Sequence, residues 1–162
     1  MSTSPPLPSV RRKERSRGEH SNLDDNLRKQ LAEVRDRYPG LRLKPGRPGF
    51  AHLEGLLAFR VKEGQYTGLQ GTFLLKIAVP RDYPRTPPVV WELRGEIPRG
   101  VHVNPDGTLC LASPIDLEMA LLERPSLLEF LERFLLGFLV GFVVFKKKGR
   151  FPYGERDHGQ RG

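Results

Sequence analysis

The chain has 162 residues, of which 38% are apolar and 28% are charged, and its formal net charge is +8. This length and composition allow one compact core, which predicts a single domain. A single cysteine excludes an intrachain disulfide framework, and residues 1–8 lack the charged and then apolar pattern of a secretory signal. We therefore expect a cytoplasmic protein.

The positive charge is concentrated at the two ends of the chain. Residues 1–21 hold five basic and two acidic side chains (+3), residues 146–162 hold six and two (+4), and the body is left at +1. Basic ends can attract phosphates, but no basic patch is interleaved with aromatic residues, so no dedicated nucleic-acid site is expected. Residues 1–20 contain almost no large apolar side chain, which predicts a flexible basic extension.

A first helix is predicted between Ser21 and Tyr38. Ser21 and Asp24 resemble the start of a capping box, and Tyr38-Pro39-Gly40 ends the pattern. Between them apolar residues recur at helical spacing, which makes this helix amphipathic: Leu23, Leu27, Leu31 and Val34.

Three strands are predicted to follow as an antiparallel meander. Residues 53–61 are apolar and β-compatible, residues 73–79 alternate with period two, and residues 89–93 form a third strand. Gly64 and Gly68 mark the first turn. Before the third strand, prolines fix several backbone angles and remove amide donors, which predicts a rigid connection: Pro80, Pro84, Pro87 and Pro88.

A C-terminal helix is predicted from Leu127 to Phe145, after Pro125-Ser126, with Glu129 and Arg133 placed to pair one turn apart. The run 134–145 consists of apolar residues and two glycines. A membrane span needs about 20 apolar residues, and this uninterrupted run has twelve. A helix buried against the sheet is therefore favoured over membrane insertion.

Three motifs follow one another in the second half of the chain. They are Tyr83-Pro84 with Pro87-Pro88, then His102-Val103-Asn104, then Gly107-Thr108-Leu109-Cys110-Leu111. In this order they resemble the Tyr-Pro, His-Pro-Asn and Gly-x-x-Cys-Leu motifs of the ubiquitin-conjugating enzymes, the E2 family, over roughly residues 22–145. The chain departs from that pattern at Val103, where the family has proline, and it lacks the tryptophan expected downstream of the cysteine.

The resemblance implies an α+β, UBC-like fold. Its parts are an N-terminal helix, an antiparallel β-meander, and a C-terminal helix packed on the sheet with an abbreviated C-terminus. Residues 21–150 would form this domain. Residues 151–162 would form a tail, either ordered near the active site or loose.

The resemblance also implies an activity. An E2-like carrier accepts a ubiquitin-like protein from an E1 as a thioester and passes it to an amine, with no metal or bound organic cofactor. Cys110 would be the nucleophile, since a thiolate is the attacking form of a thiol. The amide of Asn104 would either stabilise the oxyanion or tie down the loop, and both readings stay open. His102 would be a structural or supporting residue.

Transfer to an amine is helped by a group that orients or deprotonates it. Asp116, Glu118 and His158 are candidates from their positions in the sequence alone. His158 could fold back over the thiol, and it could equally be a solvated terminal histidine.

A narrower resemblance is to compact bacterial E2-like proteins, which occur in operons with E1-like, ubiquitin-like and JAB-type peptidase partners. Some of these operons act in antiphage defence with cyclic-nucleotide synthases. The short helical end and the tail Gly154-Glu155-Arg156-Asp157-His158-Gly159 are similar to that group. The implied partners are an E1-like enzyme, a ubiquitin-like modifier and a protein target, with a cyclic-nucleotide synthase as one candidate.

Two other interpretations are kept. A catalytically inactive UBC-like or RWD-like binding module would share the meander and the proline connection. A cysteine hydrolase would use Cys110 with His102 or His158 as its base.

Overall fold

The structure, a computed structural model, describes residues 25–152. Its elements are α1 (Asp25–Arg37), β1 (Leu41–Lys44), β2 (Phe50–Arg60), β3 (Gln70–Pro80), β4 (Val89–Glu92), α2 (Pro114–Glu123), α3 (Leu127–Phe130), the π-helical turn η1 (Leu131–Leu136) and α4 (Gly137–Lys148). The predicted α+β class and the order of helix, antiparallel meander and C-terminal helix are confirmed. The capping residues Ser21 and Asp24 lie outside the described residues.

The four strands form one antiparallel sheet in the order β1-β2-β3-β4. The central pair is long and regular, running from Phe50 opposite Pro80 to Arg60 opposite Gln70. Alternate residues of both strands are buried on one face, as period-two alternation requires: Leu53, Leu57, Phe73, Leu75 and Ile77. The predicted three-stranded meander is thus present, and β1 is an additional strand at its edge.

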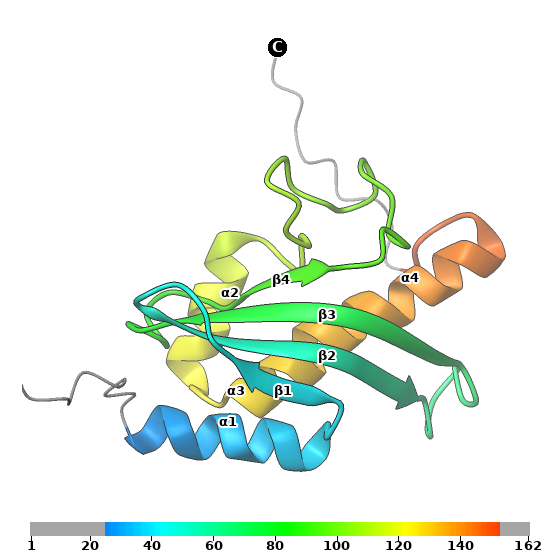
Figure 1. Cartoon of the computed structure of the whole chain (residues 1–162). Coiled ribbons are helices and arrows are strands. Elements are labelled where there is room, and N and C mark those ends of the chain that lie inside the picture. The colour runs from blue at the N-terminus through cyan, green and yellow to red at the C-terminus, as the bar shows by residue number, and fades with distance from the viewer. Residues whose placement is uncertain (1–24, 153–162) are drawn as a thin grey trace, which may run out of the picture.

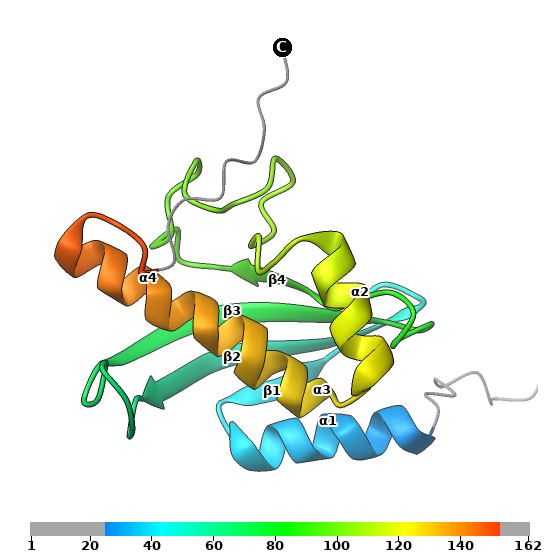
Figure 2. The same ribbon diagram turned by 180° about the vertical axis from the view of Figure 1, so that it is seen from behind.

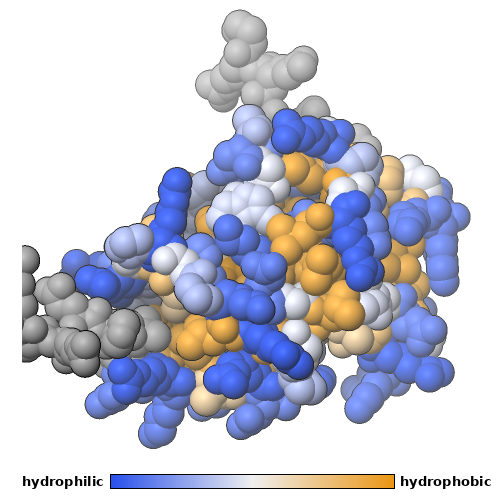
Figure 3. Space-filling model, in the orientation of Figure 1, coloured by the Kyte–Doolittle hydropathy of each residue, from blue (hydrophilic) through white to orange (hydrophobic). Residues whose placement is uncertain are grey.

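The helices cover one face of the sheet, and the opposite face is open (Figures 1 and 2). On the open face, apolar side chains gather over the strands among charged ones (Figure 3). Leu56 and Leu93 are each 41% exposed. The core therefore lies on the covered side of the sheet, between the strands, α1 and the C-terminal helices.

The C-terminal helical run is longer and less regular than predicted. It begins at Leu127 as expected but continues to Lys148, and η1 interrupts it with a π-helical turn. Its apolar run packs on the sheet, where the ring of Phe142 lies 6.1 Å from that of Phe73. Among residues 25–152, no helix has the length and apolar character needed to cross a bilayer.

The predicted pairing of Glu129 with Arg133 is wrong. Glu129 instead pairs with Arg124, at 2.8 Å between Nη1 and Oε1, and the guanidinium of Arg133 lies over the ring of Phe134. The π-helical turn begins between the two residues and changes the number of residues per turn. Positions four apart no longer share a face.

Gln30 of α1 joins three segments that are distant in sequence. Its Oε1 accepts a hydrogen bond from the backbone N–H of Leu127 (2.8 Å) and another from the hydroxyl of Tyr83 (3.2 Å). The Tyr83 hydroxyl also lies 3.1 Å from the carbonyl oxygen of Pro125. These bonds hold the proline-rich β3–β4 connection and the α2–α3 turn against α1.

Candidate functional site

The candidate site is built on a short hairpin beside the edge of the sheet. Val103 and Leu109 form an antiparallel bridge, and the Asn104 N–H donates to the Thr108 carbonyl oxygen at 2.8 Å. The Gly107 N–H returns to the Asn104 carbonyl oxygen at 2.9 Å, and Gly107 is left-handed at φ 86°. Pro105-Asp106-Gly107 therefore supplies a three-residue turn whose last position favours glycine.

A chain of three polar side chains fixes this hairpin. The buried Thr108 hydroxyl donates to Asp106 Oδ1 at 2.6 Å and accepts from Asn104 Nδ2 at 3.0 Å. Asp106 Oδ1 also accepts from the Thr108 N–H at 3.0 Å. These bonds favour the carboxylate, so they hold the pKa of Asp106 below its usual value. Thr108 thus orients the Asn104 amide within the hairpin, and both roles considered for Asn104, tying down the loop and stabilising an oxyanion, stay predictions.

Thr108→Val is expected to loosen the Asn104 amide, because valine keeps the shape of the side chain but removes the hydroxyl. The loss of two bonds at a buried site should cost about 1–3 kcal/mol of unfolding free energy. Urea denaturation measures this cost. In NMR spectra, the side-chain amide protons of Asn104 should exchange with solvent faster than in the unchanged chain. Thr108→Ser keeps the hydroxyl and is the control. Equal amide spectra for the Thr108→Val and Thr108→Ser variants would contradict the bonding described.

Two backbone hydrogen bonds fix the chain at Cys110, where the hairpin ends. Its N–H donates to the carbonyl oxygen of His102 at 2.7 Å, and the preceding N–H, of Leu109, donates to Val90 of β4 at 2.8 Å. The residue is half-buried, in contrast to the buried Leu109. Burial disfavours the thiolate and raises the pKa of the Cys110 thiol. Cys110 is therefore held in place as a partly exposed residue, and its surroundings disfavour the thiolate.

The raised pKa of Cys110 predicts that its alkylation needs a higher pH than that of a free thiol. The thiolate is the reacting form, and below the pKa its fraction rises about tenfold per pH unit. The iodoacetamide rate of Cys110 should therefore reach half of its plateau at a higher pH than the rate of a free thiol, whose usual pKa is about 8.5. Mass spectrometry of the single cysteine measures it, with a short unstructured cysteine peptide as control. A plateau below neutral pH would mean that the thiol is activated, contrary to this prediction.

His102 is held in place by an aromatic residue that the sequence did not single out. The backbone of His102 is left-handed at φ 51°, which is uncommon outside glycine, and its ring meets Phe151 edge-on at 4.6 Å. Phe151 is buried and stacks on Phe145 at 4.8 Å, so the start of the predicted tail is anchored in the core. The sequence signal that could have pointed to this contact is Phe151 itself, an aromatic residue in an otherwise polar and basic segment.

The other predicted site residues are less closely tied to the hairpin. Asp116 lies in the first turn of α2, where its carboxylate accepts from the Ser113 hydroxyl at 2.7 Å. Ser113 in turn accepts from the Asp116 N–H, so the two form a helix cap. Glu118 is exposed on the same helix. His158 lies outside the described residues. Roles for these three in transfer stay predictions.

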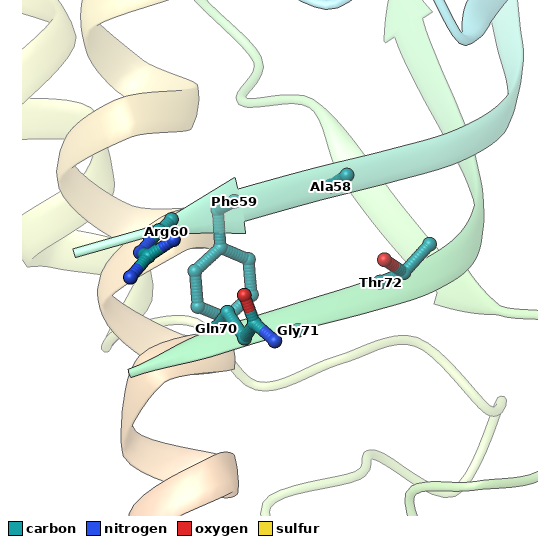
Figure 4. A pocket seen from close by; sticks show the side chains of 6 residues that line it. All are labelled: Ala58, Phe59, Arg60, Gln70, Gly71 and Thr72. Atoms are coloured by element: carbon teal, nitrogen blue, oxygen red, sulfur yellow. The ribbon is translucent and has the colours of Figure 1, made fainter. Parts of the chain in front are cut away.

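A shallow hollow is present at the end of the β2–β3 hairpin (Figure 4). It is lined by Ala58, Phe59, Arg60, Gln70, Gly71 and Thr72. Gln70 is seven residues along β3 from Ile77, which pairs with Val90 beside the candidate site. At about 3.3 Å per residue this separation is roughly 20 Å. The hollow is therefore distinct from the hairpin that carries Cys110.

The chain is similar to a solved structure of another protein. A crystal structure of a ubiquitin conjugating enzyme E2 from Plasmodium falciparum is similar to this chain, with 19% identity and a TM-score of 0.33; the match covers 78% of this chain and 96% of that one. No model of a known protein family and no curated protein matches the chain. An identity and TM-score this low do not transfer the activity of that protein to this chain.

Proposed function

We propose that the chain is an E2-like carrier that accepts a ubiquitin-like protein from an E1 as a thioester on Cys110. The observation that supports the proposal is the position of the half-buried residue Cys110 next to a hairpin that orients the Asn104 amide. Two of the three motifs by which the sequence resembles the E2 family lie in or next to that hairpin, and the third lies in the β3–β4 connection. Neither the transfer of the modifier to Cys110 nor its transfer to an amine needs a metal or a redox partner.

In the first step, the sulfur of Cys110 attacks the thioester carbonyl carbon of the E1-bound modifier. A new S–C bond forms, the S–C bond to the E1 cysteine breaks, and the proton from Cys110 passes to the departing thiolate. In the second step, a target amine attacks the same carbon. An N–C bond forms, the bond to Cys110 breaks, and the amine proton restores the thiol. An oxyanion develops in both steps, and an amide donor within reach would stabilise it.

The test is incubation of the full chain with a cognate E1, its modifier and ATP, followed by a non-reducing gel. A new band heavier by the mass of the modifier, and removed by a thiol reagent, is expected. No band with an E1 that demonstrably charges itself would reject the carrier. Omitting ATP is the control, because the E1 cannot activate the modifier without it.

A protein-binding module of UBC-like or RWD-like type is the second candidate. The observation that favours it is the antiparallel meander with its proline-rich β3–β4 connection, which such a module would share. Under this alternative the chain binds its partners but forms no adduct. The cysteine hydrolase stays a prediction, and it would cleave a modifier fusion without E1 or ATP.

We also propose the setting in which such a carrier would act. The resemblance to compact bacterial E2-like proteins suggests a cytoplasmic conjugation system with E1-like and JAB-type partners, acting in antiphage defence. The target would be a protein amine, with a cyclic-nucleotide synthase as one candidate. Genes for an E1-like and a JAB-type protein beside the gene for this chain would support this setting. Their absence would count against it.

A further inference from the structure

The helix α2 exposes an apolar stripe that the proposed transfer chemistry does not use. Ile115 is 72% exposed, Met119 is 55% exposed and Leu122 is 77% exposed. With about 100° between successive helical residues, these three fall within an arc of about 60°. The inward side of α2 is formed instead by Leu121, which is buried, and by Leu117, which packs against the core. The helix is therefore apolar on two opposite sides.

Carboxylates flank this stripe on both sides. By the same helical geometry Asp116 and Glu123 lie along one side of it and Glu118 along the other. All three are exposed, and no lysine or arginine occurs between Pro114 and Glu123. The next residue, Arg124, is ion-paired with Glu129 of α3 at 2.8 Å. In a chain of net charge +8, α2 is a local acidic and apolar surface.

We propose that the exposed face of α2 is a docking surface for a basic amphipathic segment of a partner protein. The stripe would receive apolar side chains at helical spacing, and the flanking carboxylates would meet lysine or arginine on both sides of them. α2 lies at the outer side of the helical layer, at the opposite end from the C-terminus of α4 (Figures 1 and 2). A partner helix could therefore approach it from solvent.

The charge pattern favours this occupant over two others. Two copies of α2 packed stripe to stripe would bring like-charged carboxylates together, which is unfavourable. An anionic membrane surface would repel the same carboxylates, whereas membrane-binding helices are rich in lysine and arginine. A basic partner segment gains both from burial of the stripe and from charge complementarity. The proposal holds whether or not Cys110 forms a thioester.

The experiment is a titration of the isotopically labelled full chain, followed by NMR. The probe is a synthetic helical peptide with leucine at i, i+3 and i+7 and lysine at the flanking positions. Shift changes confined to α2 and its neighbours are expected. A matched peptide with glutamate in place of each lysine should bind at least about tenfold more weakly, because it meets like charge.

Variants of the chain identify the surface. Met119→Ser with Leu122→Ser should weaken binding of the lysine peptide about tenfold or more, since two apolar anchors are removed. Leu93→Ser, on the open face of the sheet, is the matched control and should leave binding unchanged. Glu118→Lys with Glu123→Lys should reverse the preference towards the glutamate peptide. Equal binding to all these variants, or shifts confined to the sheet, would overturn the proposal.

Three further outcomes would also overturn it. One is self-association of the chain that Met119→Ser with Leu122→Ser abolishes, which would make a second copy the occupant. Another is stripe-dependent binding to vesicles containing phosphatidylserine. The last is an increase in peptide affinity when Arg11, Arg12 and Lys13 are replaced by glutamate in the full chain, which would make the basic N-terminal segment the occupant. The proposal is supported if the chain stays monomeric, does not bind the vesicles and keeps the same peptide affinity after those replacements.

Discussion

Cys110→Ala is expected to abolish the modifier adduct, and Cys110→Ser to convert it into one that resists thiol reagents. Alanine removes the attacking atom altogether. Serine keeps a nucleophile at the same position, but its product is an oxygen ester, which a thiol does not readily cleave. Non-reducing gels run with and without thiol reagent distinguish the two products. The loss with alanine should be complete, because Cys110 is the only cysteine of the chain.

The control for this prediction places a hydroxyl close to the original sulfur but not at its position. The double variant Cys110→Ala with Ala112→Ser should form no adduct, because position 112 lacks the backbone restraint that links Cys110 to His102. Thermal unfolding of each variant should match that of the unchanged chain to within a few degrees. An undiminished thiol-sensitive adduct in Cys110→Ala would place the acceptor elsewhere and reject the role of Cys110.

Three of the four strands, β2, β3 and the short β4, were predicted from the sequence, and β1 was missed. β2 and β3 each span eleven residues; period-two alternation predicted β3, and a run of apolar, β-compatible residues predicted β2. β1 has four residues, of which only Leu41 is buried, and Pro45-Gly46 follows it. Such a segment carries too little alternation to differ from a loop.

The helix α2 was missed for a reason connected with its surface. Helix prediction relies on apolar residues confined to one face. In α2 the exposed face carries Ile115, Met119 and Leu122 while the inward face carries Leu117 and Leu121, so the helical period is blurred. The same feature that hides the helix in the sequence supports its assignment as a docking surface.

The candidate site was only partly readable from the sequence. The order of motifs, with a glycine between Asn104 and Cys110, placed both residues near one turn, but the hairpin itself was not predicted. The partner of the Asn104 amide could not be predicted, because Thr108 is a common strand residue whose hydroxyl acts only through the turn geometry. The contact between His102 and Phe151 joins distant segments and has no local signal.

Phe142→Ala is expected to cost about 3–5 kcal/mol of unfolding free energy, the usual range for a buried phenylalanine. Phe142 is 1% exposed, and its ring lies near those of Phe73 and Phe145 at 6.1 and 6.2 Å. A domain is typically stable by about 5–15 kcal/mol, so this loss is a large share. Urea denaturation measures it. Phe50→Ala is the matched control, since that ring is 41% exposed and should cost under about 1 kcal/mol.

The same variant should also change the reactivity of the candidate site. A row of aromatic contacts leads from Phe142 to Phe145 and from Phe145 to Phe151. Phe151 in turn contacts the ring of His102. The carbonyl oxygen of His102 accepts a hydrogen bond from the backbone N–H of Cys110. Removing Phe142 loosens the first of these contacts, so Cys110 should be alkylated faster in the variant under native conditions. Phe50→Ala should leave that rate unchanged. A loss of stability with no change in the alkylation rate would show that the aromatic contacts do not position the thiol.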